Sequence, residues 1–331
     1  MNRTEIEQLA DRLLLLIRTR PGHRFSLDFI AGDLAVDRAH LPLAAGQLEQ
    51  WGYTLSLTET DVRLLGTPDS LTATELSWGL DTRLIGRRLL AFNQVKSTND
   101  IAFREGESGA KEGTVVVAEQ QIAGRGRLGR TWHSPAGAGS YLSILLRPKF
   151  LPENAPGLSL MTALALAQTL EHYCPGQVTI KWPNDLMISD RKVSGILPEL
   201  AADRERINYV VVGVGININQ ETHDFPPDLA DFATSVRIAS GRETNRIQLI
   251  QRFFREFEQE YLLYQQDFLG PALPRIRRYS SLLGQPIRLD TGQGIIDGVA
   301  VDLDTNGCLV VEHDGRRTSY SSGDASVVKT R

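Results

Sequence analysis

The chain has 331 residues, of which 41% are hydrophobic and 23% are charged, and its formal net charge at pH 7 is −4. This composition is that of a globular protein in water, and nothing in it favours a basic surface for nucleic acid or a membrane. Its length favours two or three domains. Cys174 and Cys308 match no metal or disulfide pattern, and the single short apolar run near the N-terminus cannot span a bilayer. We therefore expect a cytoplasmic protein that does not contact a membrane.

Residues 1–66 are expected to form three helices followed by a hairpin. Apolar residues at helical spacing predict an amphipathic helix over 4–19 and shorter helices over 26–34 and 37–51, the last capped by Asp37. The alternating stretch GYTLSLTETDVRLL, from Gly52, predicts the hairpin. This order is typical of a winged helix-turn-helix domain, whose recognition helix enters the major groove of DNA.

The predicted recognition helix is poor in side chains that contact DNA. It offers Arg38, His40 and Gln47 as DNA-binding residues, and Pro42 inside it would cost about 3 kcal/mol unless the helix begins later. Residues 1–66 carry seven arginines and no lysine against nine acidic residues, a net charge of −2. Two interpretations stay open: a domain kept for packing or regulation, and a DNA-binding domain that works as a homodimer on two weak half-sites.

Beyond a linker that begins at Gly66, strands and helices alternate. Apolar runs predict strands over 89–95, 114–120, 141–147, 178–183, 192–197 and 208–218, and helical spacing predicts helices over 159–173 and through 247–266. We expect an α+β domain with a mixed sheet over residues 67–283. After Leu283, short alternating strands separated by TGQG, TNG and DG turns predict a small SH3-like β-barrel over 284–331.

The segment GRGRLGR, residues 124–130, places Arg125, Arg127 and Arg130 among glycines directly after a predicted strand. Arginine binds carboxylates and phosphates with a two-pronged donor, and glycine lets a loop close over its ligand. The segment also matches G-x-G-x-x-G, but no helix is expected after it, so we reject a dinucleotide-binding loop. An anion-binding loop is favoured over a solvated basic turn.

A second unusual stretch is KWPNDLMISDRKVSGIL, residues 181–197. Pro183 interrupts a strand and the following Asn-Asp favours a turn. If two strands fold back across a DLMISDRK turn, four polar side chains converge in an arrangement that suits phosphate and metal: Lys181, Asn184, Asp185 and Lys192. Alternatively, the Trp-Pro pair packs in the core and Lys192 is an exposed hairpin residue.

Two shorter stretches carry small and polar residues next to predicted strands. In VVVGVGININ, Gly213 and Gly215 permit close backbone approach and Asn217 would face a ligand, unless the glycines serve packing alone. In KSTND, residues 97–99 either contact a ligand or cap the helix that follows.

Together and in this order, KSTND, AGRGRLGR, KWPNDLMISDRKVSGIL and GVGIN resemble the signature stretches of the biotin–protein ligase family. The winged-helix start and small-barrel end resemble its bifunctional type, which also represses biotin synthesis genes. The resemblance spans essentially the whole chain. It implies a ligase that uses ATP and Mg²⁺ to convert biotin to biotinyl-5′-AMP. The biotin then passes to a lysine of the biotin carboxyl carrier protein of acetyl-CoA carboxylase, and operator DNA is a second partner of the bifunctional type.

The resemblance also implies roles for individual residues. The biotin-binding residues would be Ser97, Thr98, Asn99, Gln121, Arg125, Gly126, Arg127 and Lys192. ATP or the adenylate would contact Arg127, Arg130, Trp132, Asn184, Asp185, Lys192 and Asn217. Lys192, Arg127 and Asp185 would be catalytic, and Asp185 and Asn217 would lie near Mg²⁺.

This chemistry agrees with the residues themselves. Joining a carboxylate to ATP brings two anions together, and fixed cations lower the barrier that their repulsion creates. A loop that closes over the reactive adenylate protects it from water. Two alternatives remain: a DNA-binding repressor with biotinyl-AMP as its corepressor, and a lipoate or octanoyl ligase. The Gly/Arg loop and the terminal barrel favour biotin over lipoate.

Overall fold

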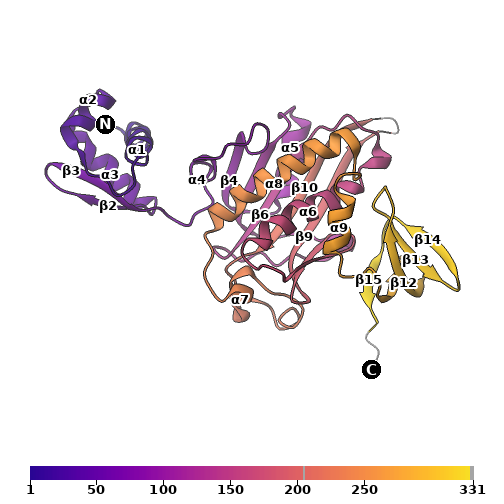
Figure 1. Cartoon of the computed structure of the whole chain (residues 1–331). Helices are drawn as coiled ribbons and strands as arrows, with labels where there is room; N and C mark the ends of the chain where they lie inside the picture. The colour runs from indigo at the N-terminus through magenta and orange to yellow at the C-terminus, as the bar shows by residue number, and fades with distance from the viewer. Residues whose placement is uncertain (204–205, 329–331) are drawn as a thin grey trace. The chain divides into compact units, whose positions relative to one another are not determined.

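The computed structural model describes residues 1–203 and 206–328, and the chain divides into two compact units, Met1–Asp69 and Ser70–Arg331 (Figure 1). Both helices and sheets are present, as the α+β prediction requires. Within the described part of the chain, no helix has the length and apolarity needed to cross a membrane.

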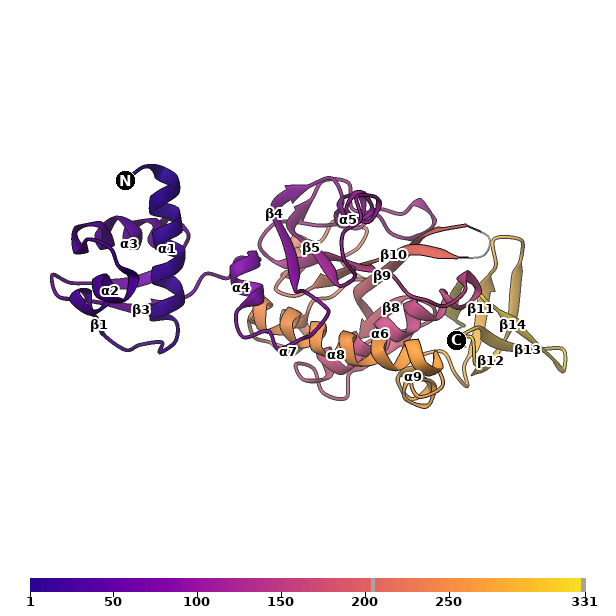
Figure 2. The same ribbon diagram turned by 90° about the horizontal axis from the view of Figure 1, so that it is seen from above.

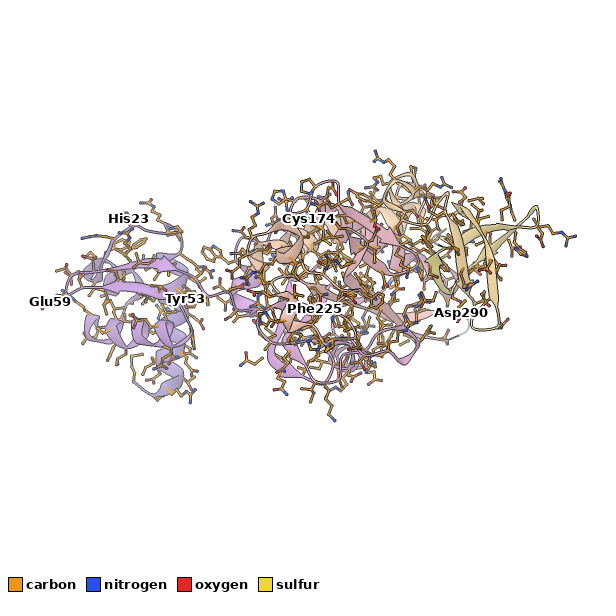
Figure 3. The ribbon with its side chains drawn as sticks, turned by 90° about the horizontal axis from the view of Figure 1, so that it is seen from below. His23, Tyr53, Glu59, Cys174, Phe225 and Asp290 are labelled. Atoms are coloured by element: carbon orange, nitrogen blue, oxygen red, sulfur yellow. The ribbon has the colours of Figure 1, made fainter. Side chains whose placement is uncertain are left out.

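The N-terminal unit contains the predicted helices and hairpin. Its elements are α1 (Arg3–Ile17), β1 (Phe25–Ser26), α2 (Leu27–Leu34), the 3-10 turn η1 (Arg38–His40), α3 (Leu41–Gln50), β2 (Thr54–Leu57) and β3 (Asp61–Gly66). The three strands form an antiparallel sheet in the order β1-β3-β2, and Glu59 lies at the tip of the β2–β3 hairpin (Figure 3). Leu13, Ile30 and Leu48 of the three helices are fully buried in one core.

The helix predicted over 37–51 is in fact two pieces. Asp37 accepts a hydrogen bond from the backbone N–H of Ala39 and so caps η1, and the α-helix begins only at Leu41. Pro42 therefore lies in the first helical turn, where its missing N–H has no intrahelical partner to lose. The expected helix-breaking cost does not arise.

The second unit is built on a seven-stranded mixed sheet in the order β4-β5-β6-β10-β9-β8-β7. Its strands are β4 (Arg88–Val95), β5 (Thr114–Gln121), β6 (Gly139–Leu146), β7 (Val178–Lys181), β8 (Asp185–Ile188), β9 (Arg191–Ala202) and β10 (Ile207–Asn217). Only the β4–β5 pair is parallel among these strands as described. The sheet therefore confirms the mixed arrangement predicted from the sequence.

Helices cover the two faces of this sheet. The short helix α5 (Thr98–Glu107) lies on one face, while α6 (Gly157–Glu171) and α8 (Arg246–Asp267) lie side by side on the other (Figure 2). Almost every residue of α6 is buried, in keeping with its nearly continuous apolar sequence. The predicted α8 face is also buried, with Ile250, Phe254 and Phe257 fully inaccessible. Shorter helices α4 (Ala73–Ser77), α7 (Val236–Ser240) and α9 (Leu273–Tyr279) complete the unit.

The segment after Pro183 differs from its prediction. We expected DLMISDRK to be a turn, but its first four residues form strand β8, with Leu186 and Ile188 buried at alternate positions. The turn itself consists of Ser189 and Asp190, both with positive φ, 49° and 62°. The prediction placed too much of the segment in the turn because two buried alternating residues are a weak strand signal.

The C-terminal part forms an antiparallel sheet in the order β14-β13-β12-β11-β15. Its strands are β11 (Pro286–Asp290), β12 (Ile295–Leu303), β13 (Leu309–His313), β14 (Arg316–Tyr320) and β15 (Asp324–Val327), the last of which was not predicted. Among the residues described up to 328, no backbone ladder joins the end strands β14 and β15, so this is an open sheet and not a closed barrel. Its inner residues, such as Ile287 and Leu309, join the main core of the second unit.

Candidate active site

A cavity of about 850 Å³ opens in the second unit. Its walls come from the start of α5, the end of β5, residues 124–130, strands β7 to β10 and the C-terminal strand β15. Every residue of this unit that the sequence predicted for the site lines it: Ser97, Thr98, Asn99, Gln121, Arg125, Gly126, Arg127, Arg130, Trp132, Asn184, Asp185, Lys192 and Asn217. Four segments far apart in the sequence therefore meet around one space.

One part of the cavity wall consists of uncharged polar side chains. Ser97 occupies the N-cap position of α5, yet its side chain makes no capping hydrogen bond, so capping does not explain this serine. Thr98 donates its backbone N–H to Gln121 Oε1 at 2.8 Å, and the Thr98 Oγ1 and Gln121 Oε1 atoms are 3.1 Å apart. All three residues of the KSTND triplet are nearly inaccessible to solvent. These bonds fix the polar wall in place.

Asn99 is held on two sides. Its Oδ1 atom accepts a hydrogen bond from Ser143 Oγ at 2.6 Å, and its Nδ2 donates to Glu199 Oε2 at 2.5 Å. A Cβ atom on Gly213 would lie only 2.3 Å from Asn99 Oδ1. Gly213 is therefore required because the Asn99 carboxamide packs directly on the backbone of β10.

The Gly/Arg loop, residues 124–130, folds back on itself beside this wall. Gly126 donates its backbone N–H to the Arg130 carbonyl at 2.7 Å, and Arg125 and Thr131 form an isolated β-bridge. Leu128, at the tip, has a positive φ of 56° and is 77% exposed. The loop thus presents its arginines from a narrow, solvent-exposed hairpin.

Cations also line the cavity. Lys192 Nζ lies 2.8 Å from Asp185 Oδ1, and Arg127 donates to Asn184 Oδ1 at 2.8 Å. Burial lowers the pKa of Arg127, although the nearby Asp185 carboxylate opposes this effect. Since Arg127 makes its short hydrogen bond to an amide and not to a carboxylate, its charge is available to an anionic ligand.

Arg130 is paired with the C-terminal sheet. Its Nη2 donates to Asp324 Oδ2 at 2.7 Å, which raises the pKa of Arg130, and Lys181 Nζ lies 3.8 Å from the other oxygen of Asp324. Arg127 also reaches the Gly323 carbonyl at 3.5 Å. Sequence reasoning missed Gly323 and Asp324, because SSGDAS has no recognisable pattern and only the fold brings β15 to the cavity.

Trp132 lies flat against the sheet. A Cβ on Gly215 would be 2.4 Å from its Cε2 atom, and a Cβ on Gly195 would be 3.0 Å from its Cζ3 atom. Lys192 Nζ is 5.5 Å from the centre of the indole ring. The Trp132 Nε1 atom is buried and has no hydrogen-bond partner among the described residues. The second glycine of GVG thus makes room for the indole.

A further segment, residues 221–235, borders the cavity next to Lys192. Lys192 donates its backbone N–H to the Phe232 carbonyl at 2.7 Å, and Thr234 donates to the Lys192 carbonyl at 2.9 Å. Phe225 and Phe232 both line the cavity, and Phe232 is 71% exposed. The sequence prediction did not include these aromatic residues, since DFPPDLADF carries no periodicity that would place them at a site.

The two residues expected near Mg²⁺ both line the cavity, but they form an incomplete ligand set. Asn217 donates through Nδ2 to the Thr234 carbonyl at 3.0 Å, and its Oδ1 accepts a long bond of 3.4 Å from Gln220. In the described ranges, no three His, Cys, Asp or Glu side chains are grouped as a metal site. One carboxylate and one weakly bound amide oxygen suit Mg²⁺ only if substrate phosphates supply further ligands.

The three residues predicted to bind DNA do not form a basic cluster. The Arg38 guanidinium pairs with Asp28 at 2.7 Å and also donates to the Glu59 carbonyl, while His40 and Gln47 are half-buried. The most exposed positions of α3 are Pro42, Leu43, Glu49 and Gln50. The outward surface of this helix therefore carries no lysine or arginine.

The comparisons with known proteins agree with this geometry. A profile of the Biotin/lipoate A/B protein ligase family matches residues 91–217, and one of the Biotin protein ligase C terminal domain matches residues 282–328. The chain is 36% identical to the "Bifunctional ligase/repressor BirA" of Bacillus subtilis over 83% of this chain and 86% of that protein. It is 30% identical to the protein of the same name from Escherichia coli, over 95% of this chain and 96% of the relative.

The fold is similar to that of a biotin protein ligase from Aquifex aeolicus in complex with biotin and ATP. The two share 30% identity with a TM-score of 0.65, over 74% of this chain and 100% of that one. These matches, together with the site, define a ligase of the biotin and lipoate type. The chain belongs to the biotin protein ligase family.

Proposed function

We propose that this chain activates biotin with ATP to form biotinyl-5′-AMP and transfers the biotin to a lysine of the biotin carboxyl carrier protein of acetyl-CoA carboxylase. One observation carries the proposal: an uncharged polar wall and a cluster of cations face the same cavity. This arrangement suits a ligand with a polar ring at one end and a carboxylate that must meet a phosphate.

The ring system of biotin would bind at the polar wall. Its ureido group offers two N–H donors and one carbonyl acceptor, and hydroxyl and amide side chains can serve both. Ser97, Thr98, Asn99 and Gln121 are the residues proposed for this role, and Arg125 and Gly126 contribute the adjoining backbone of the Gly/Arg loop. The buried hydrogen bonds among these residues hold the pocket in shape before biotin enters.

In the first step, a biotin carboxylate oxygen attacks the α-phosphorus of ATP, and the bond from that phosphorus to pyrophosphate breaks. Lys192 and Arg127 would offset the charge that gathers between the two anions. Arg130, Trp132, Asn184 and Asn217 are proposed to contact the nucleotide. The aromatic rings of Phe225 and Phe232, which both line the cavity, offer a surface for the adenine base.

In the second step, the carrier lysine amine attacks the acyl carbon and AMP leaves. The amine must lose a proton, and Asp185 is the proposed acceptor because its carboxylate lies at the reacting end of the cavity, 2.8 Å from Lys192 Nζ. Mg²⁺ would be held by Asp185, Asn217 and the phosphates, and it would neutralise phosphate charge.

The finer architecture is also a proposal. Three helices and a hairpin support a winged helix over residues 1–66. The five-stranded antiparallel sheet and the match to the Biotin protein ligase C terminal domain support an SH3-like arrangement over 284–331, although the sheet is open. Residues 67–283 are then the proposed catalytic domain. The two cysteines are free, which is compatible with the reducing cytoplasm.

A biotin-responsive DNA-binding repressor, acting as a homodimer with biotinyl-AMP as its corepressor, is the second candidate function. The observation that favours it is the alignment with the Escherichia coli bifunctional ligase/repressor, which covers 95% of this chain. The weak basic character of α3 argues against it. The two functions are not exclusive, because they depend on different units.

The deciding experiment mixes the purified chain with ATP, Mg²⁺, biotin and a biotin carrier domain, and measures biotin attached to the carrier by mass spectrometry. Lipoate in place of biotin tests the sister activity of the matched family. Attachment of biotin but not lipoate supports the proposal. Attachment of lipoate alone would replace the proposal with a lipoate ligase. If neither biotin nor lipoate is attached to the carrier, both functions are contradicted.

A further inference from the structure

The three arginines of the Gly/Arg loop are not equivalent. Arg125 Nη1 lies 2.6 Å from Asp100 Oδ1, and its Nη2 lies 3.3 Å from Glu199 Oε2. Asp100 belongs to the first turn of α5 and Glu199 to β9, so one guanidinium joins two elements of the fold. The hydrogen bond that Arg125 donates to Asp100, reinforced by the charge of Glu199, raises the pKa of Arg125. Arg125 is thus already neutralised by two carboxylates.

Arg127 has the opposite environment. Its short hydrogen bond goes to the Asn184 amide, its second to a backbone carbonyl, and burial lowers its pKa. An incoming anion meets an Arg127 that is hydrogen-bonded to no carboxylate of the described residues, although Asp185 and Asp324 lie near it, but must compete with two direct carboxylate partners for Arg125. Within the loop, Arg125 therefore holds the backbone to the fold, whereas Arg127 is placed to meet an anionic ligand.

Glu199 has a second contact that the loop does not explain. Its Oε2 atom accepts from both Arg125 and Asn99, the latter at 2.5 Å. A carboxylate accepts hydrogen bonds and donates none, so Glu199 turns the amino side of the Asn99 carboxamide toward itself and the oxygen toward Ser143. Through Glu199, the orientation of the Asn99 carboxamide is thus linked to Arg125, near the start of the Gly/Arg loop.

We propose that Asp100 and Glu199 are positioning residues that anchor the Gly/Arg loop through Arg125, and that Glu199 also orients Asn99 in the ring pocket. Neither carboxylate acts on the substrate directly. The role of Glu199 in orienting Asn99 toward biotin rests on the proposed function, whereas the anchoring of the loop does not. Loss of the anchor should loosen the loop without unfolding the unit, since all three charged side chains are partly exposed, at 33% to 44%.

Limited trypsin digestion of the full chain tests the anchor without ligand. Trypsin cleaves after arginine, so cleavage after Arg127 and Arg130 reports directly on the loop. In the double variant Asp100→Asn/Glu199→Gln, we expect cleavage there roughly three- to tenfold faster than in the wild type, with an unchanged melting temperature. Glu105→Gln is the matched control, because Glu105 lies on the same helix and pairs with Arg88 at 2.6 Å, away from the loop. Equal loop cleavage in the double variant and the wild type would overturn the anchor.

Steady-state kinetics of pyrophosphate release tests the link to Asn99. Glu199→Gln keeps an oxygen that can accept from Asn99, whereas Glu199→Ala removes it. The alanine variant should raise the KM for biotin more than the glutamine variant does, while kcat changes less than KM in both. Equal KM values in the two variants would refute the Asn99 role. A wild-type chain that is inactive with biotin, but whose loop cleavage still responds to the double substitution, would refute the proposed function and leave the anchor standing.

Discussion

Lys192 Nζ lies 2.8 Å from Asp185 Oδ1, on neighbouring strands that share the hairpin turn at Ser189 and Asp190. Lys192 is the cation proposed to offset the charge of the two reacting anions. Asp185 is the carboxylate proposed to accept a proton from the carrier lysine amine. Both side chains are partly buried, at 34% and 20% exposure. When an anionic ligand arrives, Lys192 can turn from the carboxylate to the ligand, which leaves Asp185 free to accept a proton.

We first predict the effect of replacing this lysine. Lys192→Ala should reduce the rate of adenylate formation by about 10²- to 10³-fold, the usual cost of one preorganised donor at a developing charge. Its partly exposed position means that the melting temperature should change little. Pyrophosphate release in single-turnover conditions measures the rate, and Lys149→Ala, at an exposed lysine of the same unit, is the control. Unchanged single-turnover rates in Lys192→Ala would refute the assignment of the site.

Arg127→Ala should chiefly affect retention of the adenylate. Arg127 is half-buried and, within the described part of the chain, makes no hydrogen bond to a carboxylate, so its loss removes a charge that a ligand can reach without displacing a bonded carboxylate. We expect biotinyl-AMP to leave the variant at least tenfold faster, as measured by gel filtration after one turnover. Arg130→Ala should have a smaller effect, because Arg130 is 68% exposed and pairs with Asp324. A larger effect at Arg130 than at Arg127 would reverse these roles.

Gly215→Ala tests the close approach of Trp132 to the sheet. A Cβ at this position would lie 2.4 Å from the indole, so the ring must move away from the cavity wall. We expect weaker ATP binding by calorimetry and a changed near-ultraviolet circular dichroism spectrum. Gly294→Ala is the control, since a Cβ there meets nothing within 4 Å. Normal ATP affinity in Gly215→Ala would show that the indole position does not matter for binding.

The hydrogen bond from Arg130 of the loop to Asp324 predicts that the thermal stability of the protein depends on pH. Burial by itself would raise the Asp324 pKa, but the hydrogen bond from Arg130 and the charge of Lys181 bring it below the ordinary value of 3.8. A carboxyl whose pKa is lower in the folded state stabilises that state above its unfolded pKa, and this contribution disappears as the pH falls through the folded value. The melting temperature of the wild type should therefore exceed that of Asp324→Asn at pH 7, and the difference should shrink as the pH falls below 3.8. A difference that grows toward acid pH would contradict this.

DNA binding provides a separate prediction for the N-terminal unit. Because Arg38 is engaged by Asp28 and no cation stands among the most exposed α3 positions, we expect no specific complex at physiological salt. Gel shift with DNA from upstream of biotin synthesis genes, in the presence of biotin, ATP and Mg²⁺, measures it. A shift that Arg38→Ala abolishes would restore the DNA-binding interpretation for Arg38.

Much of the local structure followed from the sequence. The period of apolar residues determined α1, α6 and α8, because an amphipathic or wholly apolar helix must bury those residues whatever surrounds it. The same holds for the run of valines in β5. Glycine and arginine at alternate positions also indicated an anion-binding loop, since both residue types have specific physical uses.

The sequence pattern did not predict the elements whose formation depends on contacts between segments that are distant in the chain. Strand β8 escaped prediction because four residues hold too little periodicity, and β15 because its pairing partner β11 lies more than thirty residues away along the chain. The sheet of the predicted barrel is open for the same reason: alternation predicts strands, but closure depends on which edges pair.

The sequence by itself therefore determined the long helices and most of the strands, and which residue types could meet an anion. Only the tertiary structure decided which charge faces which partner: Arg125 is neutralised by Asp100 and Glu199, Arg130 is held by Asp324, and Arg127 is left for the ligand. The physical reason is that backbone preference acts over a few residues, whereas the electrostatic energy of a side chain depends on charges that the fold brings within a few ångströms from any part of the chain.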